Sequence, residues 1–213
     1  MKTKKPPLLM TAGPTYVPPR ILKALSRPLI YHRTPEFIEI VQNCIDRLKK
    51  VYKTKNEPFI IASSGTGAME AAISNCINPG DKVLSLVNGI FSERMSNIAT
   101  AFGATVRNLS VPLGQAFDVE KFKSVFQESE YKLVTVVHNE TSTGVKNDIA
   151  EIGKIVKNTN SLLACDVISS LAGDDIRTDE WGVDFCIAGS QKCLMLPPGL
   201  SFITVSEKAW EVV

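Results

Sequence analysis

Short apolar runs alternate with amphipathic helical stretches along most of the 213-residue chain, and this alternation limits the folds open to it. The apolar runs are nearly continuous, which is typical of strands covered on both faces. Repeated strand–helix–strand units therefore predict an α/β fold, with a mainly parallel seven-stranded sheet and helices on both faces. The predicted strands are Phe59–Ser63, Lys82–Val87, Thr105–Val111, Lys132–Asn139, Leu162–Ile168, Phe185–Ala188 and Ser201–Val205. The predicted helices are Ile38–Tyr52, Gly67–Ile77, Phe91–Phe102, Val119–Gln127 and Ile149–Lys157.

The residues that follow the strands are the candidate site residues, because ligands of such sheets bind at the carboxyl ends of the strands. The first predicted strand leads into a helix through four small residues: Ser64, Gly65, Thr66 and Gly67. Backbone N–H groups and the helix dipole favour an anion there. The segment has neither the Gly-Lys-Ser/Thr of a Walker A loop nor the third glycine of the dinucleotide fingerprint. A phosphate site and a plain tight turn both fit this segment.

Two charged residues stand beside strongly apolar runs. Asp166 belongs to the fifth predicted strand, where a carboxylate must be paired or hydrogen-bonded. A protonated pyridine nitrogen would satisfy it, and so would capping of the next turn. Lys192 follows the sixth predicted strand and precedes the apolar segment 193–196. Partial burial favours the neutral amine that condenses with an aldehyde, although a lysine extending from a surface turn is the commoner case.

Hydroxyl and amide side chains follow the fourth predicted strand, over residues 138–144. Thr141 lies in the middle of this run and could hydrogen-bond the polar edge of a ligand. A capped loop that leads to the next helix is the alternative.

The charge of the chain argues against nucleic-acid and membrane partners. Its 24 Lys and Arg against 22 Asp and Glu leave a formal charge of +2, too little to attract a polyanion. The basic run of Lys2, Lys4 and Lys5 is expected to be a solvated tail. Two histidines and five scattered cysteines predict no metal site. Without a long apolar segment or a signal peptide, we expect a cytoplasmic protein with reduced thiols.

The order of these motifs resembles the class V aminotransferases of the fold-type I pyridoxal-phosphate enzymes, especially the alanine–glyoxylate and serine–pyruvate branch. The likeness runs from Gly13-Pro14-Thr15 to Pro197-Pro198-Gly199 and includes Gly189-Ser190-Gln191-Lys192, a group highly specific in that family. It implies an N-terminal arm over residues 1–20 and a cofactor-binding large domain over residues 21–213. Family members are considerably longer and have a small C-terminal domain. The resemblance thus predicts a truncated product, a broken gene or one part of a split protein.

The resemblance also implies a role for each candidate residue. Lys192 should bind pyridoxal 5′-phosphate as a Schiff base and move a proton between substrate and cofactor. Asp166 should keep the pyridine nitrogen protonated. Phe91 should stack on one face of the ring, where relatives often carry Trp, and Val167 and Ile168 should pack on the other. The remaining implied contacts are Ser64, Gly65, Thr66, Gly67 and Gln191 for the phosphate, Thr141 for a hydrogen bond to the cofactor, and Gly13 for the substrate carboxylate.

The activity implied is transamination between a small amino acid of the alanine or serine type and a 2-oxo acid of the glyoxylate or pyruvate type. The full-length form is expected to be a homodimer. One alternative is a lyase such as a cysteine desulfurase on the same scaffold, but desulfurases carry histidine at the place of Phe91. The other alternative is an inactive fragment that binds cofactor or a partner chain, because the arginine expected to clamp the substrate carboxylate would lie in the missing part.

Overall fold

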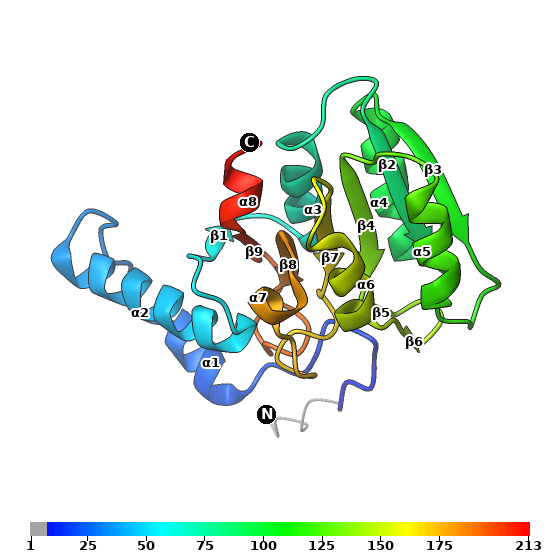
Figure 1. Ribbon diagram of the computed structural model, residues 1–213. Helices are drawn as coiled ribbons and strands as arrows, with labels where there is room; N and C mark the ends of the chain where they lie inside the picture. Colours follow the sequence, from blue (N-terminus) through cyan, green and yellow to red (C-terminus); the bar gives the residue numbers. More distant parts are fainter. Residues whose placement is uncertain (1–7) are drawn as a thin grey trace.

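A seven-stranded sheet forms the centre of the computed structural model, which describes residues 8–213 (Figure 1). The order across the sheet is β1-β9-β8-β7-β4-β2-β3. The strands are β1 (Phe59–Ile61), β2 (Lys82–Val87), β3 (Thr105–Ser110), β4 (Leu133–Val137), β7 (Leu162–Asp166), β8 (Phe185–Gly189) and β9 (Ser201–Val205). The predicted α/β fold with a mainly parallel sheet is confirmed.

One strand of the sheet runs against the others. All pairs from β8 to β3 are parallel, whereas β9 is antiparallel to both β8 and β1. Two reversals cancel, so β1 points in the same direction as β8. The carboxyl ends of six strands therefore meet at one edge of the sheet. This arrangement brings the segments after β1, β2, β4, β7 and β8 together, although they are far apart in sequence.

Helices cover both faces of the sheet, as predicted. On one face lie α3 (Gly65–Ser74), α4 (Ile90–Ala101) and α8 (Glu207–Trp210). On the other lie α5 (Val119–Gln127), α6 (Ile149–Val156) and α7 (Thr178–Trp181). Each layer buries its own apolar cluster, because successive strand residues point to opposite faces.

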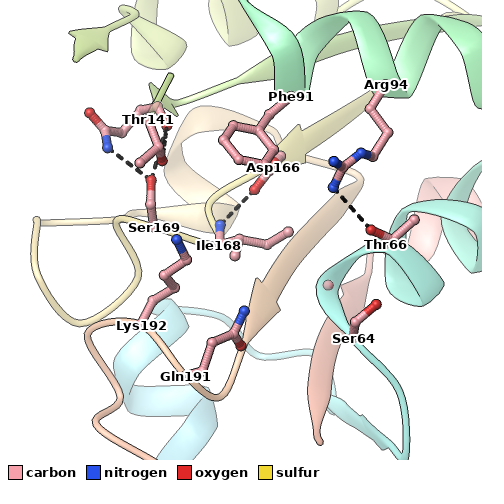
Figure 2. Close-up of a pocket in the computed structure, with 12 residues that line it drawn as sticks. Ser64, Thr66, Phe91, Arg94, Thr141, Asp166, Ile168, Ser169, Gln191 and Lys192 are labelled. Atoms are coloured by element: carbon pink, nitrogen blue, oxygen red, sulfur yellow. Dashed lines mark hydrogen bonds between the residues drawn. The ribbon is translucent and has the colours of Figure 1, made fainter. Parts of the chain in front are cut away.

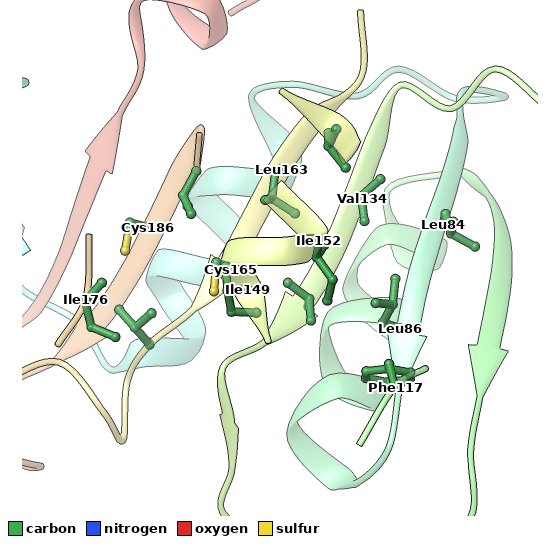
Figure 3. Packing of buried hydrophobic residues seen from close by; sticks show 14 of the residues in the cluster. Leu84, Leu86, Phe117, Val134, Ile149, Ile152, Leu163, Cys165, Ile176 and Cys186 are labelled. Atoms are coloured by element: carbon green, nitrogen blue, oxygen red, sulfur yellow. The ribbon is translucent and has the colours of Figure 1, made fainter. Parts of the chain in front are cut away.

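The core beneath α6 illustrates this packing (Figure 3). Ile149 and Ile152 of α6 lie against Val134 of β4 and Leu163 of β7, and all four side chains are at most 1% exposed. Full burial of one such side chain contributes about 1.5–3 kcal/mol. These contacts hold β4 and β7 rigidly beside each other, and the segments after both strands reach the edge where the candidate residues gather.

Several element boundaries differ from the sequence-based expectations. The fourth strand stops at Val137, and the next residues form a small hairpin of β5 (Asn139–Glu140) and β6 (Val145–Lys146). The helix after β1 begins at Gly65, two residues earlier than predicted. α2 (Pro35–Tyr52) also begins early, because Thr34 accepts a hydrogen bond from the backbone N–H of Phe37 and caps the helix.

The described part of the N-terminal arm crosses the loop after β8. The Thr15 N–H donates to the Gln191 carbonyl at 3.0 Å, and its Oγ1 donates to the Lys192 carbonyl at 2.9 Å. The predicted arm boundary at residue 20 falls within α1 (Pro19–Leu25), a helix that was not predicted; the division into arm and domain stays a prediction. The basic run at residues 2–5 lies outside the described residues. No helix within residues 8–213 is long and apolar enough to cross a membrane.

Candidate active site

One pocket opens at the edge of the sheet where the carboxyl ends of the strands meet (Figure 2). Segments that follow β1, β2, β4, β7 and β8 all contribute to it. Its lining residues are Ser64, Gly65, Thr66, Phe91, Arg94, Asn139, Thr141, Asp166, Ile168, Ser169, Gln191 and Lys192. All residues predicted to contact the cofactor are among them except Gly67 and Val167. The Gly67 N–H instead donates to the Ser64 carbonyl within the turn, at 2.9 Å.

The N-terminus of α3 forms one end of the pocket. Ser64 is the N-cap residue, but its side chain makes no capping hydrogen bond. The N–H groups of Gly65 and Thr66, the first two of α3, have no partner within the helix and are therefore available to an anion. Gly65 is buried against Ile168, and a Cβ at position 65 would overlap the Ile168 Cδ1 atom. A larger residue here would require the Ile168 side chain to shift, so the glycine lets the helix start lie close to Ile168.

Asp166 ends β7 and is only 4% exposed. Within residues 8–213, its carboxyl accepts one hydrogen bond, from the Ile168 N–H to Oδ1 at 2.7 Å. Burial raises the pKa of Asp166 from 3.8 to about 7, and that single hydrogen bond only partly opposes the effect. A desolvated carboxyl that faces a pocket with one hydrogen bond is suited to receive a positively charged or N–H donor group from a ligand.

Lys192 follows β8 and is half-buried at the pocket. Its Nζ donates to the Ala12 carbonyl at 2.6 Å, so the amine contacts the N-terminal arm. Gly13 does not line the pocket, but its backbone lies against this side chain: a Cβ at position 13 would be 2.7 Å from Lys192 Nζ. The predicted proximity of Gly13 to the reactive centre therefore has a structural basis, while its contact with a substrate stays a prediction.

Two apolar side chains border the space between Asp166 and the mouth of the pocket. Phe91 comes from the first turn of α4 and Ile168 from the segment after β7. The expectation that Val167 joins Ile168 at the ligand is wrong. Val167 is 1% exposed and belongs to the core cluster under α6, because neighbouring residues of an extended segment point to opposite sides.

Three lining residues were not predicted from the sequence: Arg94, Asn139 and Ser169. Asn139 Nδ2 donates to Ser169 Oγ at 2.8 Å, and Ser169 Oγ donates to the Asn139 carbonyl at 2.9 Å. This pair fastens the segment after β4 to the segment after β7. Arg94 lies three residues after Phe91 on α4, and residues at this spacing share one helix face. The three-residue spacing from Phe91 could therefore have predicted Arg94 as a lining residue of the pocket.

Glu140 connects the segment that carries Thr141 with the helix that carries Phe91. It is fully buried, and its carboxylate accepts hydrogen bonds from the backbone N–H of Phe91 at 3.4 Å and of Ser92 at 2.9 Å. Burial by itself would raise the pKa of Glu140, but hydrogen bonds from Ser142 and Ser92 outweigh it and lower the pKa below its usual value. Glu140 is therefore an ionised cap on the N-terminus of α4.

Comparison with known proteins gives one consistent result. The family model for class V aminotransferases matches residues 7–213. An uncharacterized aminotransferase of Methanocaldococcus jannaschii is 49% identical over 97% of this chain and 54% of the relative. L-aspartate–glyoxylate aminotransferase of Paracoccus denitrificans is 40% identical over 94% of this chain and 52% of the relative.

A solved structure agrees with these matches. The crystal structure of an alanine–glyoxylate aminotransferase from Nostoc sp. superposes with a TM-score of 0.93 at 34% identity, covering 99% of this chain and 57% of that one. The chain spans about half the length of the curated relatives it matches. From the family match and these similarities, the chain belongs to the class V aminotransferase family.

Proposed function

We propose that this chain binds pyridoxal 5′-phosphate in the pocket described above and is the cofactor-binding part of an aminotransferase. The observation that carries the proposal is the presence of three different groups in one pocket: the Lys192 amine, the Asp166 carboxyl and the N-terminus of α3. The proposed reaction transfers an amino group between a small amino acid of the alanine or serine type and a 2-oxo acid of the glyoxylate or pyruvate type. Similarity to relatives whose names give glyoxylate as a substrate supports this choice of 2-oxo acid.

The residues present fit the cofactor at its aldehyde, its ring nitrogen and its phosphate. Lys192 supplies the amine for its aldehyde, and Asp166 supplies a carboxyl for its ring nitrogen. The uncapped start of α3, together with Gln191, supplies donors for its phosphate. When bound, the cofactor supplies an aldehyde that condenses with amines and a ring that withdraws electrons from the substrate Cα.

The protein side chains then have separate tasks. Asp166 holds a proton on the ring nitrogen; its hydrogen bond from the Ile168 N–H keeps the carboxyl aimed along the pocket. Phe91 and Ile168 exclude water from the space between them. Lys192 Nζ accepts the proton that leaves the substrate Cα, for which it must exchange its hydrogen bond to the Ala12 carbonyl. Thr141 offers a hydroxyl from the opposite side of the pocket to Thr66 (Figure 2).

We also propose a cytoplasmic homodimer for the full-length form. A lyase of the desulfurase type is less well supported, because Phe91 occupies the stacking place where such enzymes carry histidine. An inactive cofactor-binding fragment remains the principal alternative, and an experiment on the purified chain separates it from a working enzyme.

The test is reductive trapping followed by substrate addition. Borohydride reduction of the chain incubated with pyridoxal phosphate should leave a pyridoxyl group on the peptide that contains Lys192. Lys192→Ala should lose both this modification and the visible absorbance of the bound cofactor. Lys154→Ala, at an exposed lysine of α6, is the matched control and should lose neither.

Alanine or serine, added before reduction, should convert the visible spectrum to that of the aminated cofactor. Trapping without any spectral response to a panel of amino acids would identify an inactive cofactor-binding fragment. Trapping on a lysine other than Lys192, or intact absorbance in Lys192→Ala, would refute the assignment of the site.

A further inference from the structure

Arg94 reaches the pocket from α4 and is fixed there by two contacts. Its Nη1 donates to Thr66 Oγ1 at 3.2 Å, and its guanidinium carbon lies 5.1 Å from the centre of the Phe91 ring. The side chain is half-buried. None of the ion pairs found among residues 8–213 includes it. Arg94 is therefore a positioned cation without a carboxylate partner in the described part of the chain.

The guanidinium retains unused hydrogen-bonding capacity. An arginine has five N–H donors in a planar fork that matches phosphate and carboxylate. Within residues 8–213, the contact with Thr66 is the one hydrogen bond that Arg94 donates to the protein. The cation–π contact with Phe91 helps to hold the guanidinium in place while leaving other N–H groups for a ligand.

The position of Arg94 in the pocket indicates which group of the ligand it would contact. In Figure 2, Arg94 and Thr66 lie on one side of Ile168, whereas Lys192 and Thr141 lie on the other. Thr66 is the second residue of α3, whose N-terminus is the anion site of the pocket. Gly13, the residue predicted to meet the substrate carboxylate, lies beside Lys192 instead. Arg94 is thus located at the phosphate end and not at the substrate end.

Charge balance favours a cation at that end. A phosphate monoester carries about −1.5 to −2 charges at neutral pH, whereas a helix N-terminus offers only about half a positive charge. Among the described residues, two cationic side chains line the pocket, those of Lys192 and Arg94. Lys192 is committed to the aldehyde, which leaves Arg94 to balance the phosphate.

We infer that Arg94 is a binding residue for the phosphate group of the cofactor, held ready by Thr66 and Phe91. This inference rests on the proposed function, because it requires pyridoxal phosphate to occupy the pocket. The inference also extends the proposed function, since the affinity for the phosphate then depends on a residue of α4 and not on the start of α3 alone.

The test compares pyridoxal phosphate with pyridoxal, which has the same ring and aldehyde but no phosphate. Dissociation constants are measured by absorbance titration for the wild-type chain and for Arg94→Met, Arg94→Gln and Arg94→Lys. Arg94→Met should weaken binding of pyridoxal phosphate by about 10- to 100-fold, the range for a lost charge-assisted hydrogen bond. Its affinity for pyridoxal should change by less than about threefold, the effect of a weak exposed cation–π contact at most. Arg94→Lys should fall between the wild type and Arg94→Met.

Two controls keep the result interpretable. Arg107→Met removes an exposed arginine on β3, paired with Glu128 and remote from the pocket, and should change neither constant. Arg94→Gln retains a donor for Thr66 and packs over Phe91, so it carries the test if Arg94→Met does not fold. Thermal unfolding without ligand identifies such a variant.

The possible outcomes distinguish a failure of the inference about Arg94 from a failure of the proposed function. Equal weakening for both ligands would mean that Arg94 only holds Phe91 and Thr66 in place, and would overturn the inference. So would unchanged binding of both ligands. If the wild-type chain forms no adduct with either compound at Lys192, the proposed function fails, and the inference fails with it.

Discussion

The Lys192 ammonium donates a hydrogen bond of 2.6 Å to the carbonyl oxygen of Ala12, so the proposed catalytic lysine is bound to the N-terminal arm. The arm in turn holds the backbone of the lysine loop through Thr15, which bonds to both Gln191 and Lys192. The arm therefore belongs to the candidate active site and is not a passive extension of the domain.

Thr15→Val should loosen the lysine loop without removing any group that faces the cofactor. The loss of the hydroxyl hydrogen bond should speed cofactor release by about 2- to 10-fold, because the backbone of Lys192 is then held less firmly, while the backbone hydrogen bond from residue 15 to Gln191 remains. Release is followed by the decay of visible absorbance after dilution. Thr105→Val, at an exposed position of β3, should leave the rate unchanged. Equal rates in both variants would exclude the arm from cofactor retention.

Asp166→Asn should alter the pH dependence of stability in the cofactor-free chain. Burial raises the pKa of Asp166 from 3.8 to about 7, so the folded state keeps this proton after the unfolded state has lost it. The stability of the wild type should therefore fall between about pH 4 and pH 7, by about 4 kcal/mol from this group. Denaturant unfolding should show a flatter profile for Asp166→Asn.

Asp118→Asn is the matched control, because it changes an exposed aspartate that caps α5 and an asparagine caps equally well. Its stability profile should follow the wild type. With cofactor and substrate present, Asp166→Asn should slow turnover by about 100- to 1,000-fold, since an amide cannot balance a protonated ring nitrogen. A profile for Asp166→Asn as steep as that of the wild type would show that the carboxyl is solvated in the folded state.

Glu140→Gln should destabilise the fold at neutral pH by about 2 kcal/mol, because it replaces a buried ionised acceptor of several hydrogen bonds. The pKa of Glu140 lies below its ordinary value of 4.5. Its contribution is therefore present above that pH and is lost as the pH falls through the folded pKa. The difference between variant and wild type should shrink in acid, as measured by denaturant unfolding.

Glu120→Gln provides the comparison for this prediction, since Glu120 also stands in the first turn of a helix but is exposed. It should change stability by less than about 0.5 kcal/mol. A loss of the same size in both variants would reduce Glu140 to an ordinary helix-dipole contact and would remove its proposed link between Phe91 and the Thr141 segment.

Gly65→Ala should weaken cofactor binding through Ile168 and not through the phosphate. The added methyl group would overlap the Ile168 Cδ1 atom and force that side chain into the pocket, at a cost of about 1–3 kcal/mol in stability. The double variant Gly65→Ala/Ile168→Val removes the overlapping methyl group and should recover part of both losses. Cofactor titration and thermal unfolding check both variants, and a double variant no better than Gly65→Ala would disprove this route.

The sequence was sufficient for the fold because most strands of the sheet are apolar runs separated by helical stretches, although β1 is short and β3 is largely polar. It was insufficient for strand direction: β9 is covered on both faces just as β8 is, so its reversal leaves no mark in its composition. The two-residue strands β5 and β6 are too short for any periodicity. α1 has seven residues and buries none of them, and this length is too short for its apolar residues to establish a helical period.

The candidate site was predicted to the extent that its residues follow strand ends. Asp166 and Lys192 stand out as charges beside apolar runs, and the structure brings both to one pocket. Arg94 was missed because a single charge on an amphipathic helix looks like an ordinary solvated residue. Val167 was misplaced because adjacent apolar letters do not reveal which of them faces the core.

The reversed strand has a consequence for how the chain assembles. β1 lies at the edge of the sheet, and within residues 8–213 it pairs with β9 alone, about 140 residues later in the sequence. During synthesis the segment that carries β1 leaves the ribosome early, yet it can dock only after β9 has been made. The phosphate end of the pocket begins directly after β1, so it is among the last parts to be completed. Bringing β1 and β9 together closes a long loop, and we expect this step to set when the chain first becomes able to bind its cofactor.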